Sequence, residues 1–309
     1  MVESPIVIGI VGDLAAGRKT LAKGVAQALG EHNTTIFCTD DYRRYDLQEL
    51  ERTGMSELHP DGLHIDVIEQ HIRLLKQGEA VLKPVYNDAT GKVDSQDYIK
   101  PKQFVIVEGL HGYFTKGLRD LYDIKFYLAP AEELRFKWKI RSDAVKPGYN
   151  EEKARKALIK FEPDSEAFIR PQKKWADMVI VYHKLAKSAV ESDSNLGISM
   201  ILRPTLSHIE WAGILSSLPD HDDIRLELDR DMGLPVDRLE INGDITDEAA
   251  LSLKSHIQGA LPETIDSESL DKLGWFHDLS GEEKQSQTFA LAQLIAALHI
   301  LNIDKSDHA

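Results

Sequence analysis

The sequence predicts an α/β fold in which a mainly parallel β-sheet is flanked by helices. Two observations support this prediction. Short apolar runs rich in β-branched residues alternate with helical segments over the first 185 residues, which is typical of parallel strands joined by helices. A glycine-containing loop follows the first apolar run, at the edge of the sheet where such folds bind their ligands.

The individual elements follow from residue patterns taken in order along the chain. Strands are predicted at short apolar runs, and helices where apolar residues recur every three or four positions. Between Ile65 and Leu75 the apolar residues share one helical face, and Gly78 ends that helix. The predicted strands are Pro5–Val11, Thr34–Asp40, Phe104–Gly109, Asp123–Ala129 and Ala176–Tyr182. The predicted helices are residues 18–30, 65–78 and 131–143.

The distribution of charge indicates where the chain divides. Its net charge is −14, and nearly all of the acidic excess lies in residues 201–309. The polar, serine-containing segment 184–195 precedes this shift and is predicted to be a connector. We therefore expect one domain in residues 1–185 and a smaller α+β extension in residues 196–309 that packs on it. A solvated acidic surface explains the excess, and it would repel nucleic acids, so we expect no nucleic-acid partner.

Other features of the composition suit a cytoplasmic protein. No apolar run approaches the roughly 20 residues that span a bilayer, so we expect no membrane contact. The start "MVESPIVIGIVGD" lacks a basic region before its apolar stretch and is not expected to be a secretion signal. The single cysteine, Cys38, excludes an intrachain disulfide and suits a reducing compartment.

The loop "GDLAAGRKT" has the spacing of a phosphate-binding loop, which follows the rule G-x-x-x-x-G-K-[ST]. Gly12 and Gly17 satisfy the rule. Arg18 and Lys19 stand where it requires a lysine and then a serine or threonine, and Thr20 comes one position late. The residues expected to contact nucleotide phosphates are Gly12, Asp13, Ala15, Ala16, Gly17, Arg18, Lys19 and Thr20.

Acidic residues follow two of the predicted strands. Asp40 and Asp41 end or follow the second strand, and Glu108 lies at the end of "FVIVE". Each acid alone is equally compatible with a helix cap or a solvated loop. Three acids beside a glycine loop at one edge of a sheet favour a catalytic site.

Several stretches resemble the phosphoribulokinase family, within the phosphoribulokinase and uridine kinase superfamily of P-loop kinases. They are "TDDYRRYD", "GEAVLKPVYNDATG", "FVIVEGLHGYF", "FKWKIRSD" and "EPDSEAFIRPQKKWADMVI". "LPVDRLEINGDI" and "TFALAQLIAALHIL" resemble the C-terminal strand and last helix of the long form found in plants, cyanobacteria and archaea. The resemblance covers most of the chain and implies a P-loop kinase fold and a homodimer.

The resemblance also implies the reaction and the residues that perform it. The family transfers the γ-phosphoryl group of ATP, bound with Mg²⁺, to a hydroxyl of ribulose 5-phosphate. Asp40 then corresponds to the catalytic base and Glu108 to the magnesium ligand, and Lys139 and Asp143 match further catalytic positions. The expected substrate-binding residues are Arg43, Lys83, Tyr86, His111 and Arg141. A structural salt bridge for Lys83 and a buried, hydrogen-bonded core position for His111 are the alternatives.

The departures from the family pattern fall in the expected active site. Arg18 replaces a lysine and keeps its charge, but it is longer, planar and forked. Lys19 replaces a hydroxyl that binds magnesium, and an ammonium group cannot ligate a cation. Leu47, Ser142 and Phe161 stand where the family has arginines, and Arg43 stands where it has a histidine.

These substitutions leave different functions open. The first is a divergent kinase that acts on ribulose 5-phosphate or a related sugar phosphate. The second is a pseudokinase that keeps the fold, binds a nucleotide and works by association. A uridine-type nucleoside kinase is a further alternative, disfavoured because the C-terminal segment matches the phosphoribulokinase form.

Overall fold

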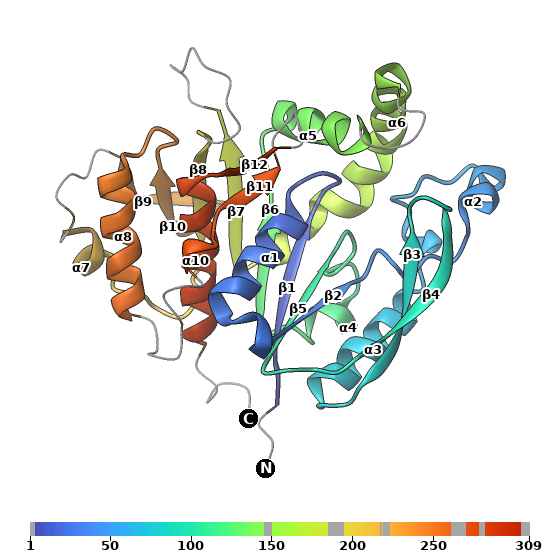
Figure 1. The fold of residues 1–309 in the computed structure, drawn as a ribbon, viewed down its shortest axis with the longest axis horizontal. Helices are drawn as coiled ribbons and strands as arrows, with labels where there is room; N and C mark the ends of the chain where they lie inside the picture. Colours follow the sequence, from blue (N-terminus) through green and yellow to red (C-terminus); the bar gives the residue numbers. More distant parts are fainter. Residues whose placement is uncertain are drawn as a thin grey trace.

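The computed structural model describes residues 4–144, 150–184, 195–216, 218, 223–260, 270–277 and 282–303. Figure 1 shows a central sheet with helices packed against both of its faces. The predicted connector, 184–195, lies outside the described residues except for its two ends. Within these described ranges, no helix is both long and apolar enough to cross a membrane.

The central sheet has eight strands. They are β1 (Ile6–Gly12), β2 (Thr34–Cys38), β5 (Phe104–Gly109), β6 (Ile124–Leu128), β7 (Met178–His183), β8 (Gly197–Leu202), β9 (Ile224–Asp231) and β10 (Leu234–Ile241). Their spatial order is β2-β5-β1-β6-β7-β8-β10-β9. The pairs from β2 to β7 are parallel, whereas β8, β10 and β9 are joined by antiparallel pairs. The predicted α/β fold with a mainly parallel sheet is therefore confirmed.

Two hairpins stand outside the central sheet. One joins β3 (Val81–Asn87) to β4 (Lys92–Ile99), and the other joins β11 (Trp275–His277) to β12 (Glu283–Gln285). The sequence pattern predicts neither hairpin, because β4 and β12 are polar and exposed. The described helices are α1 (Arg18–Leu29), α2 (Leu47–Thr53), α3 (Ile65–Lys76), α4 (Lys116–Arg119), α5 (Glu132–Ala144), α6 (Glu151–Asp164), α7 (Trp211–Ser216), α8 (Asp247–Ala260) and α10 (Gln287–Leu301).

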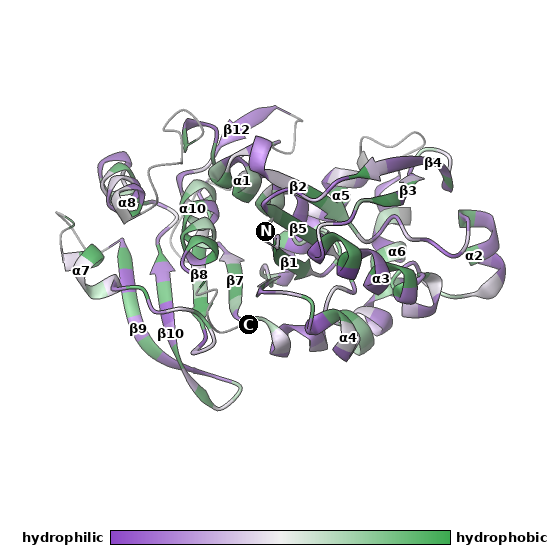
Figure 2. Ribbon diagram, turned by 90° about the horizontal axis from the view of Figure 1, so that it is seen from below, coloured by the Kyte–Doolittle hydropathy of each residue, from purple (hydrophilic) through white to green (hydrophobic). Residues whose placement is uncertain are grey.

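The hydrophobic core lies on both faces of the sheet. Side chains of β1 alternate between the two: Ile8 and Ile10 join the cluster beneath α1 and α10, whereas Val7 and Val11 join the cluster beneath α3. Because both faces of β1 are covered, every residue of this strand is buried. Buried and exposed strands differ in hydropathy. In Figure 2, β7 of the central sheet is largely hydrophobic, whereas β4 of the exposed hairpin is largely hydrophilic. This rigid centre fixes the position of the loop that follows β1.

Helix α10 packs directly against α1, the helix that follows the glycine loop. Gly24 permits this approach, because a Cβ atom there would lie 1.9 Å from Cδ of Gln293. The Gln293 side chain donates to the carbonyl of Thr20 across 3.2 Å and accepts from the amide of Gly274 across 2.8 Å. The C-terminal segment therefore supports the helix on which the candidate site is built.

Strands from both sides of the predicted connector share one sheet. β8 pairs with β7 along its whole length, from Gly197 opposite His183 to Leu202 opposite Met178. The hydrophobic cluster beneath α1 likewise continues into α8 and α10. The division at residues 185 and 196 stays a prediction about folding units, since the sheet itself is continuous.

Candidate active site

Strand β1 ends in the glycine-containing loop, which turns directly into α1. Ala15 and Gly17 have φ angles of 59° and 89°, and Ala16 donates its amide hydrogen to the Asp13 carbonyl across 3.1 Å. Gly17 precedes α1 without a side-chain cap, and the first turn holds no acidic residue. The amides that begin α1 are therefore available to an anion. Contacts of this loop with nucleotide phosphates stay a prediction.

The side chain of Arg18 contacts two carboxylates. Its Nη2 donates to Oδ2 of Asp40 across 2.9 Å, and its Nη1 donates to Oε2 of Glu108 across 3.4 Å. Arg18 is only 8% exposed, and Glu108 only 2%. Burial opposes the charge of Arg18, but Asp40 and Glu108 outweigh burial and raise the pKa of the guanidinium. The predicted base and the predicted metal ligand thus share one buried cation.

Asp40 is held ionised at the end of β2. Its Oδ1 accepts a hydrogen bond from the amide of Leu110 across 2.9 Å. Burial alone would raise the pKa of this carboxyl, but Arg18, Arg43 and the Leu110 amide together lower it. The missing side chain of Gly109 leaves room for this segment, because a Cβ atom there would lie 1.8 Å from Oγ1 of Thr39 and 3.0 Å from Oδ1 of Asp40. The carboxylate can accept a proton, and the ion pair makes it a weak base.

Cys38 belongs to the same cluster, although it is not among the site residues predicted from the sequence. Cys38 is the register neighbour of Glu108 in the β2–β5 pair, and its sulfur lies within 4.8 Å of ligand atoms of Asp40 and Glu108. Burial, followed by the charges of Asp40 and Glu108, raises the pKa of this thiol. Placing Glu108 opposite the end of the second predicted strand would have identified Cys38 as its neighbour.

These three residues do not fit magnesium as they are arranged. Magnesium takes hard oxygen ligands in octahedral geometry, whereas this set contains a protonated thiol. One oxygen of Asp40 and one of Glu108 already accept hydrogen bonds from Arg18. Lys19, at the position of the usual hydroxyl ligand, is exposed and carries an ammonium group. Magnesium binding by Glu108 stays a prediction, and this geometry argues against it.

Asp13 lies in a buried ionic network beneath the loop. Its carboxylate accepts from the Ser165 hydroxyl in a short hydrogen bond and pairs with Arg135 across 3.2 Å and with Arg170 across 3.4 Å. Both arginines also pair with Glu162 of α6. The network ties the loop to α5 and α6. The sequence pattern does not predict this network, because Asp13 lies more than a hundred residues from both Arg135 and Arg170.

Three of the predicted substrate-binding residues make structural contacts. Lys83 is buried and forms a short ion pair with Asp41, which is the alternative considered for it. Asp41 also accepts from the amide of Tyr86 across 3.2 Å. The guanidinium of Arg43 lies over the Tyr86 ring at 5.5 Å and donates to the carbonyl of Glu57 across 2.8 Å. Substrate binding by these residues stays a prediction.

Several buried polar atoms near Asp40 have no hydrogen-bond partner among the described residues. They are Oγ1 of Thr39, Nε of Arg43 and Nδ1 of His111. The other ring nitrogen of His111 bonds to the Leu58 carbonyl across 3.0 Å. Burial lowers the pKa of His111 to about 4, although the charge of Asp40 opposes this shift. His111 is therefore neutral at pH 7, and its Nδ1 is a buried acceptor without a partner among the described residues.

The remaining predicted site residues lie on α5 and α2. Lys139 pairs with Asp143 across 2.8 Å, and the Ser142 hydroxyl donates to the Lys139 carbonyl. Arg141 lies 5.9 Å from the ring centre of Phe276, so α5 also meets the β11–β12 hairpin. Leu47 is the first residue of α2 and is 43% exposed. Catalytic roles for Lys139 and Asp143 stay predictions.

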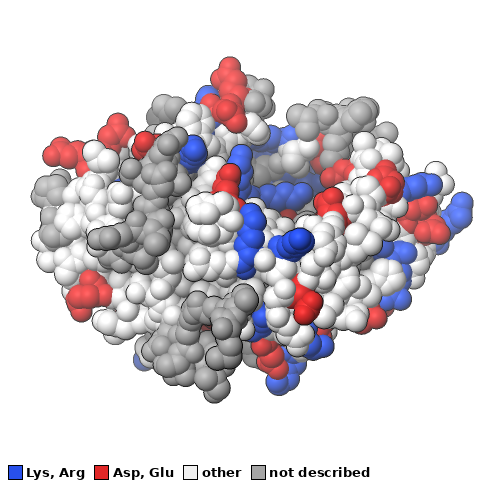
Figure 3. Space-filling view, turned by 60° about the horizontal axis from the view of Figure 1, so that its bottom comes forward, with Lys and Arg blue, Asp and Glu red and all other residues white. Residues whose placement is uncertain are grey.

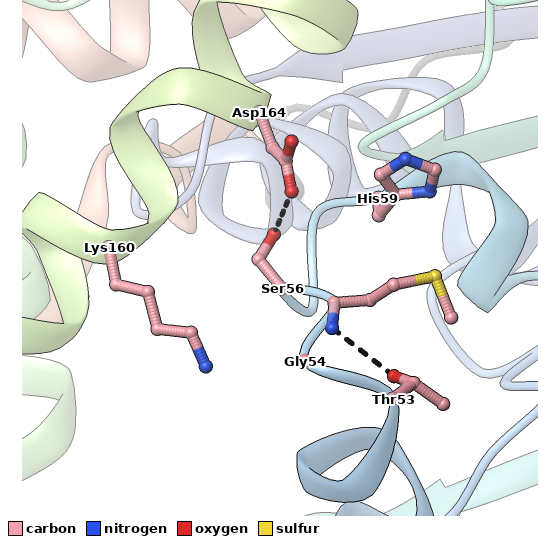
Figure 4. Close-up of a pocket in the computed structure, with 7 residues that line it drawn as sticks. Thr53, Gly54, Ser56, His59, Lys160 and Asp164 are labelled. Carbon is pink, nitrogen blue, oxygen red and sulfur yellow. Dashed lines mark hydrogen bonds between the residues drawn. The ribbon is translucent and has the colours of Figure 1, made fainter.

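A groove of about 360 Å³ lies between the segment after α2 and helix α6. It is lined by Thr53, Gly54, Met55, Ser56, His59, Lys160 and Asp164. In Figure 4 the Lys160 side chain extends into the open space between these elements, and Ser56 bonds to Asp164 across 2.6 Å. The neighbouring Phe161 packs into an apolar cluster with Leu58. Phe161 stands where the family resemblance leads us to expect an arginine. The positive charge that lines this groove comes instead from Lys160, one position earlier in the chain.

Charge is unevenly distributed over the surface. On the face drawn in Figure 3, Lys and Arg side chains gather in and beside a hollow near the middle. Acidic side chains are scattered around this hollow. A protein with a net charge of −14 thus still presents a basic region that suits a small anion.

A protein-family comparison matches residues 7–188 to the "Phosphoribulokinase / Uridine kinase family". The chain is 34% identical over 175 residues to a phosphoribulokinase of Synechocystis sp., covering 57% of this chain and 53% of that one. It is 32% identical over 196 residues to the chloroplastic phosphoribulokinase of Triticum aestivum, covering 58% and 48%. A uridine kinase of Latilactobacillus sakei is 26% identical over 181 residues, covering 58% and 86%. The chain therefore spans about half the length of the phosphoribulokinases it matches.

Among solved structures, the phosphoribulokinase of Rhodobacter spheroides resembles this fold with a TM-score of 0.60. The superposition covers 83% of this chain and 95% of that one at 16% identity. At this identity the likeness concerns the fold alone, and it extends beyond residue 188, where the family match ends. Neither comparison tests the predicted homodimer or the cytoplasmic location, which stay predictions.

Proposed function

Because the chain belongs to the phosphoribulokinase and uridine kinase family, we propose that it transfers the terminal phosphoryl group of ATP to a hydroxyl of ribulose 5-phosphate or a related sugar phosphate. The surroundings of Asp40 carry this proposal. An ionised carboxylate lies beside the glycine-containing loop, next to buried polar atoms of Arg43 and His111 that lack partners. The similarity to phosphoribulokinases supports the choice of acceptor.

The proposed reaction uses groups of this chain at each step. The amides at the start of α1 hold the phosphates of ATP. Nδ1 of His111 accepts from a hydroxyl of the acceptor and Nε of Arg43 donates to one, once neighbouring side chains move to expose these buried atoms. The acceptor oxygen attacks the γ-phosphorus, the bond from that phosphorus to the oxygen of the departing ADP breaks, and the hydroxyl proton passes to Asp40. Since Arg18 weakens Asp40 as a base, turnover should be slow.

A second function is favoured by one observation. The hydrogen bonds from Arg18 to both Asp40 and Glu108 occupy the two carboxylates that the reaction would use. A protein in which this arrangement persists would bind a nucleotide without transferring its phosphoryl group. Such a pseudokinase would act through association rather than catalysis.

A coupled ADP-release assay separates these functions. Ribulose 5-phosphate, ribose 5-phosphate and uridine would each be offered with ATP to the wild type and to Asp40→Asn. We expect turnover of a pentose phosphate, reduced about 10²- to 10⁴-fold in Asp40→Asn. Turnover of uridine alone would support the nucleoside kinase. ATP binding without turnover of any acceptor would support the pseudokinase and reject the proposed reaction.

A further inference from the structure

The guanidinium of Arg18 takes the position of a bridging cation. It contacts Asp40, just after β2, through Nη2 and Glu108 of β5 through Nη1. The three side chains are between 3% and 18% exposed, so water screens these contacts poorly. In phosphoryl-transfer enzymes, carboxylates at this edge of the sheet hold a divalent metal. Here a side chain of the protein provides the positive charge.

A divalent ion could enter this position only by displacing Arg18. The ion would have to break both ion pairs, or it would lie a few ångströms from a buried guanidinium that repels it. The ammonium group of Lys19, the next residue, adds to this repulsion. Displacement would also move a charged side chain that is now 8% exposed. The site therefore selects against a metal ion through charge as well as through its ligands.

Arg18 can still serve an anion while it holds the carboxylates. A guanidinium has five N–H groups in one plane. Two of those in Arg18 donate to Asp40 and Glu108, and the described residues leave the others for an incoming phosphate. Because Arg18 is the first residue of α1, its backbone amide also lies at the phosphate-binding end of that helix.

We propose that Arg18 is the built-in cation of this site, and that nucleotide phosphates bind here without a divalent metal. The inference rests on the proposed nucleotide site, but it does not require catalysis. It also accounts for the substitution of Lys19, since a hydroxyl ligand is not needed where no metal binds.

Titration with Mn²⁺, followed by electron paramagnetic resonance in the absence of nucleotide, tests the exclusion of metal. We expect Arg18→Ala to bind Mn²⁺ at least about tenfold more tightly than the wild type, and Glu108→Gln in that background to remove the gain. Arg73→Ala is the matched control, because Arg73 lies in an exposed ion pair on α3. Equal Mn²⁺ affinity in the wild type and Arg18→Ala would overturn the proposal. If Arg18→Ala does not fold, Arg18→Met takes its place.

Calorimetry with ATP tests the second half of the proposal on the wild type alone. We expect the dissociation constant to change by less than about threefold between excess EDTA and millimolar Mg²⁺. Binding that weakens tenfold or more in EDTA, or no binding in either buffer, would overturn it. A failed acceptor assay would reject the proposed reaction and leave both of these measurements unaffected, so the two conclusions can fail separately.

Discussion

The guanidinium of Arg18 lies 2.9 Å from the carboxylate of Asp40, although the two residues belong to different elements and the second is the expected catalytic base. This pairing places the substituted residue of the phosphate loop in direct contact with the expected catalytic base. A lysine would carry one compact charge, whereas this forked guanidinium donates from two nitrogens to two carboxylates. The substitution at position 18 therefore acts on the two carboxylates as well as on the loop.

Replacing Arg18 should destabilise the protein. Arg18→Ala leaves the buried Glu108 and the neighbouring Asp40 as unpaired charges, which should cost about 3–5 kcal/mol of unfolding free energy. Arg73→Ala, which breaks an exposed pair with Glu69, should cost about 0.5 kcal/mol or less. Urea unfolding of both variants at pH 7 measures the difference. Equal losses would mean that the Arg18 pairs contribute little to stability.

The family residues should restore metal dependence. In Arg18→Lys combined with Lys19→Thr, the carboxylates lose their guanidinium and the loop regains a hydroxyl ligand. We expect tighter ATP binding that weakens when Mg²⁺ is chelated, measured by calorimetry. Adding Leu47→Arg and Ser142→Arg should improve use of ribulose 5-phosphate, at about 1.5–3 kcal/mol for each charge-assisted contact. A wild type that turns over faster than both variants would show that Arg18 and Lys19 form a working loop.

Cys38 should react slowly with thiol reagents. Burial and the charges of Asp40 and Glu108 raise its pKa, and the thiolate is the reactive form. With Ellman's reagent at pH 8, we expect the native protein to react at least about tenfold more slowly than the chain unfolded in guanidinium. Equal rates would indicate an accessible thiolate and a different arrangement of the cluster. The same chemistry argues against a redox switch at this position.

His299 should make stability depend on pH. Burial lowers its pKa to about 4, and neither ring nitrogen has a partner among the described residues. Between about pH 6.5 and pH 4 the unfolded state binds the extra proton, so stability falls as pH decreases. His299→Leu should raise the unfolding free energy by about 1–3 kcal/mol at pH 7 and reduce its pH slope.

Denaturant unfolding at pH 7 and pH 5 provides this comparison. His256→Leu is the control, because His256 is exposed on α8 and bonds to the Ser252 carbonyl. A loss of stability at pH 7 in His299→Leu would mean that the ring makes favourable contacts in the core. An unchanged slope would contradict the low pKa.

The contact between Gly24 and Gln293 should be revealed by a double-mutant cycle. Gly24→Ala would force its Cβ into the Gln293 side chain, which is buried and held at both ends, at a cost of about 1–3 kcal/mol. In a Gln293→Ala background the same change should be neutral or stabilising, since alanine is favoured in helices by about 1 kcal/mol. Additive effects would show that α1 and α10 do not meet at this point.

The sequence predicts the centre of this fold better than its edges. The run Phe104–Gly109 is a strand with the predicted bounds, because a strand buried on both faces needs a continuous apolar run. The hairpin β3–β4 is not predicted, because β4 is polar and nearly all of its residues are exposed. In the site, Asp40 and Glu108 were found from their places at strand ends. Arg18 is 22 residues from Asp40 and 90 residues from Glu108 in the sequence. The hydrogen bonds between them depend on where the side chains point in the folded protein, which no local sequence pattern encodes.

The antiparallel pairing of β8 with β7 bears on how the chain can be divided for experiments. The family match ends at residue 188, so a fragment that stops there would retain the glycine loop and Asp40. It would also leave β7 at the border of the sheet, with the backbone groups that now bond to β8 unpaired. The buried side chains of Met178 and Ile180 would lose the cover of α10 and its neighbours. Such a fragment should self-associate through this exposed edge. Nucleotide binding measured on it would then reflect the aggregate and not the candidate active site.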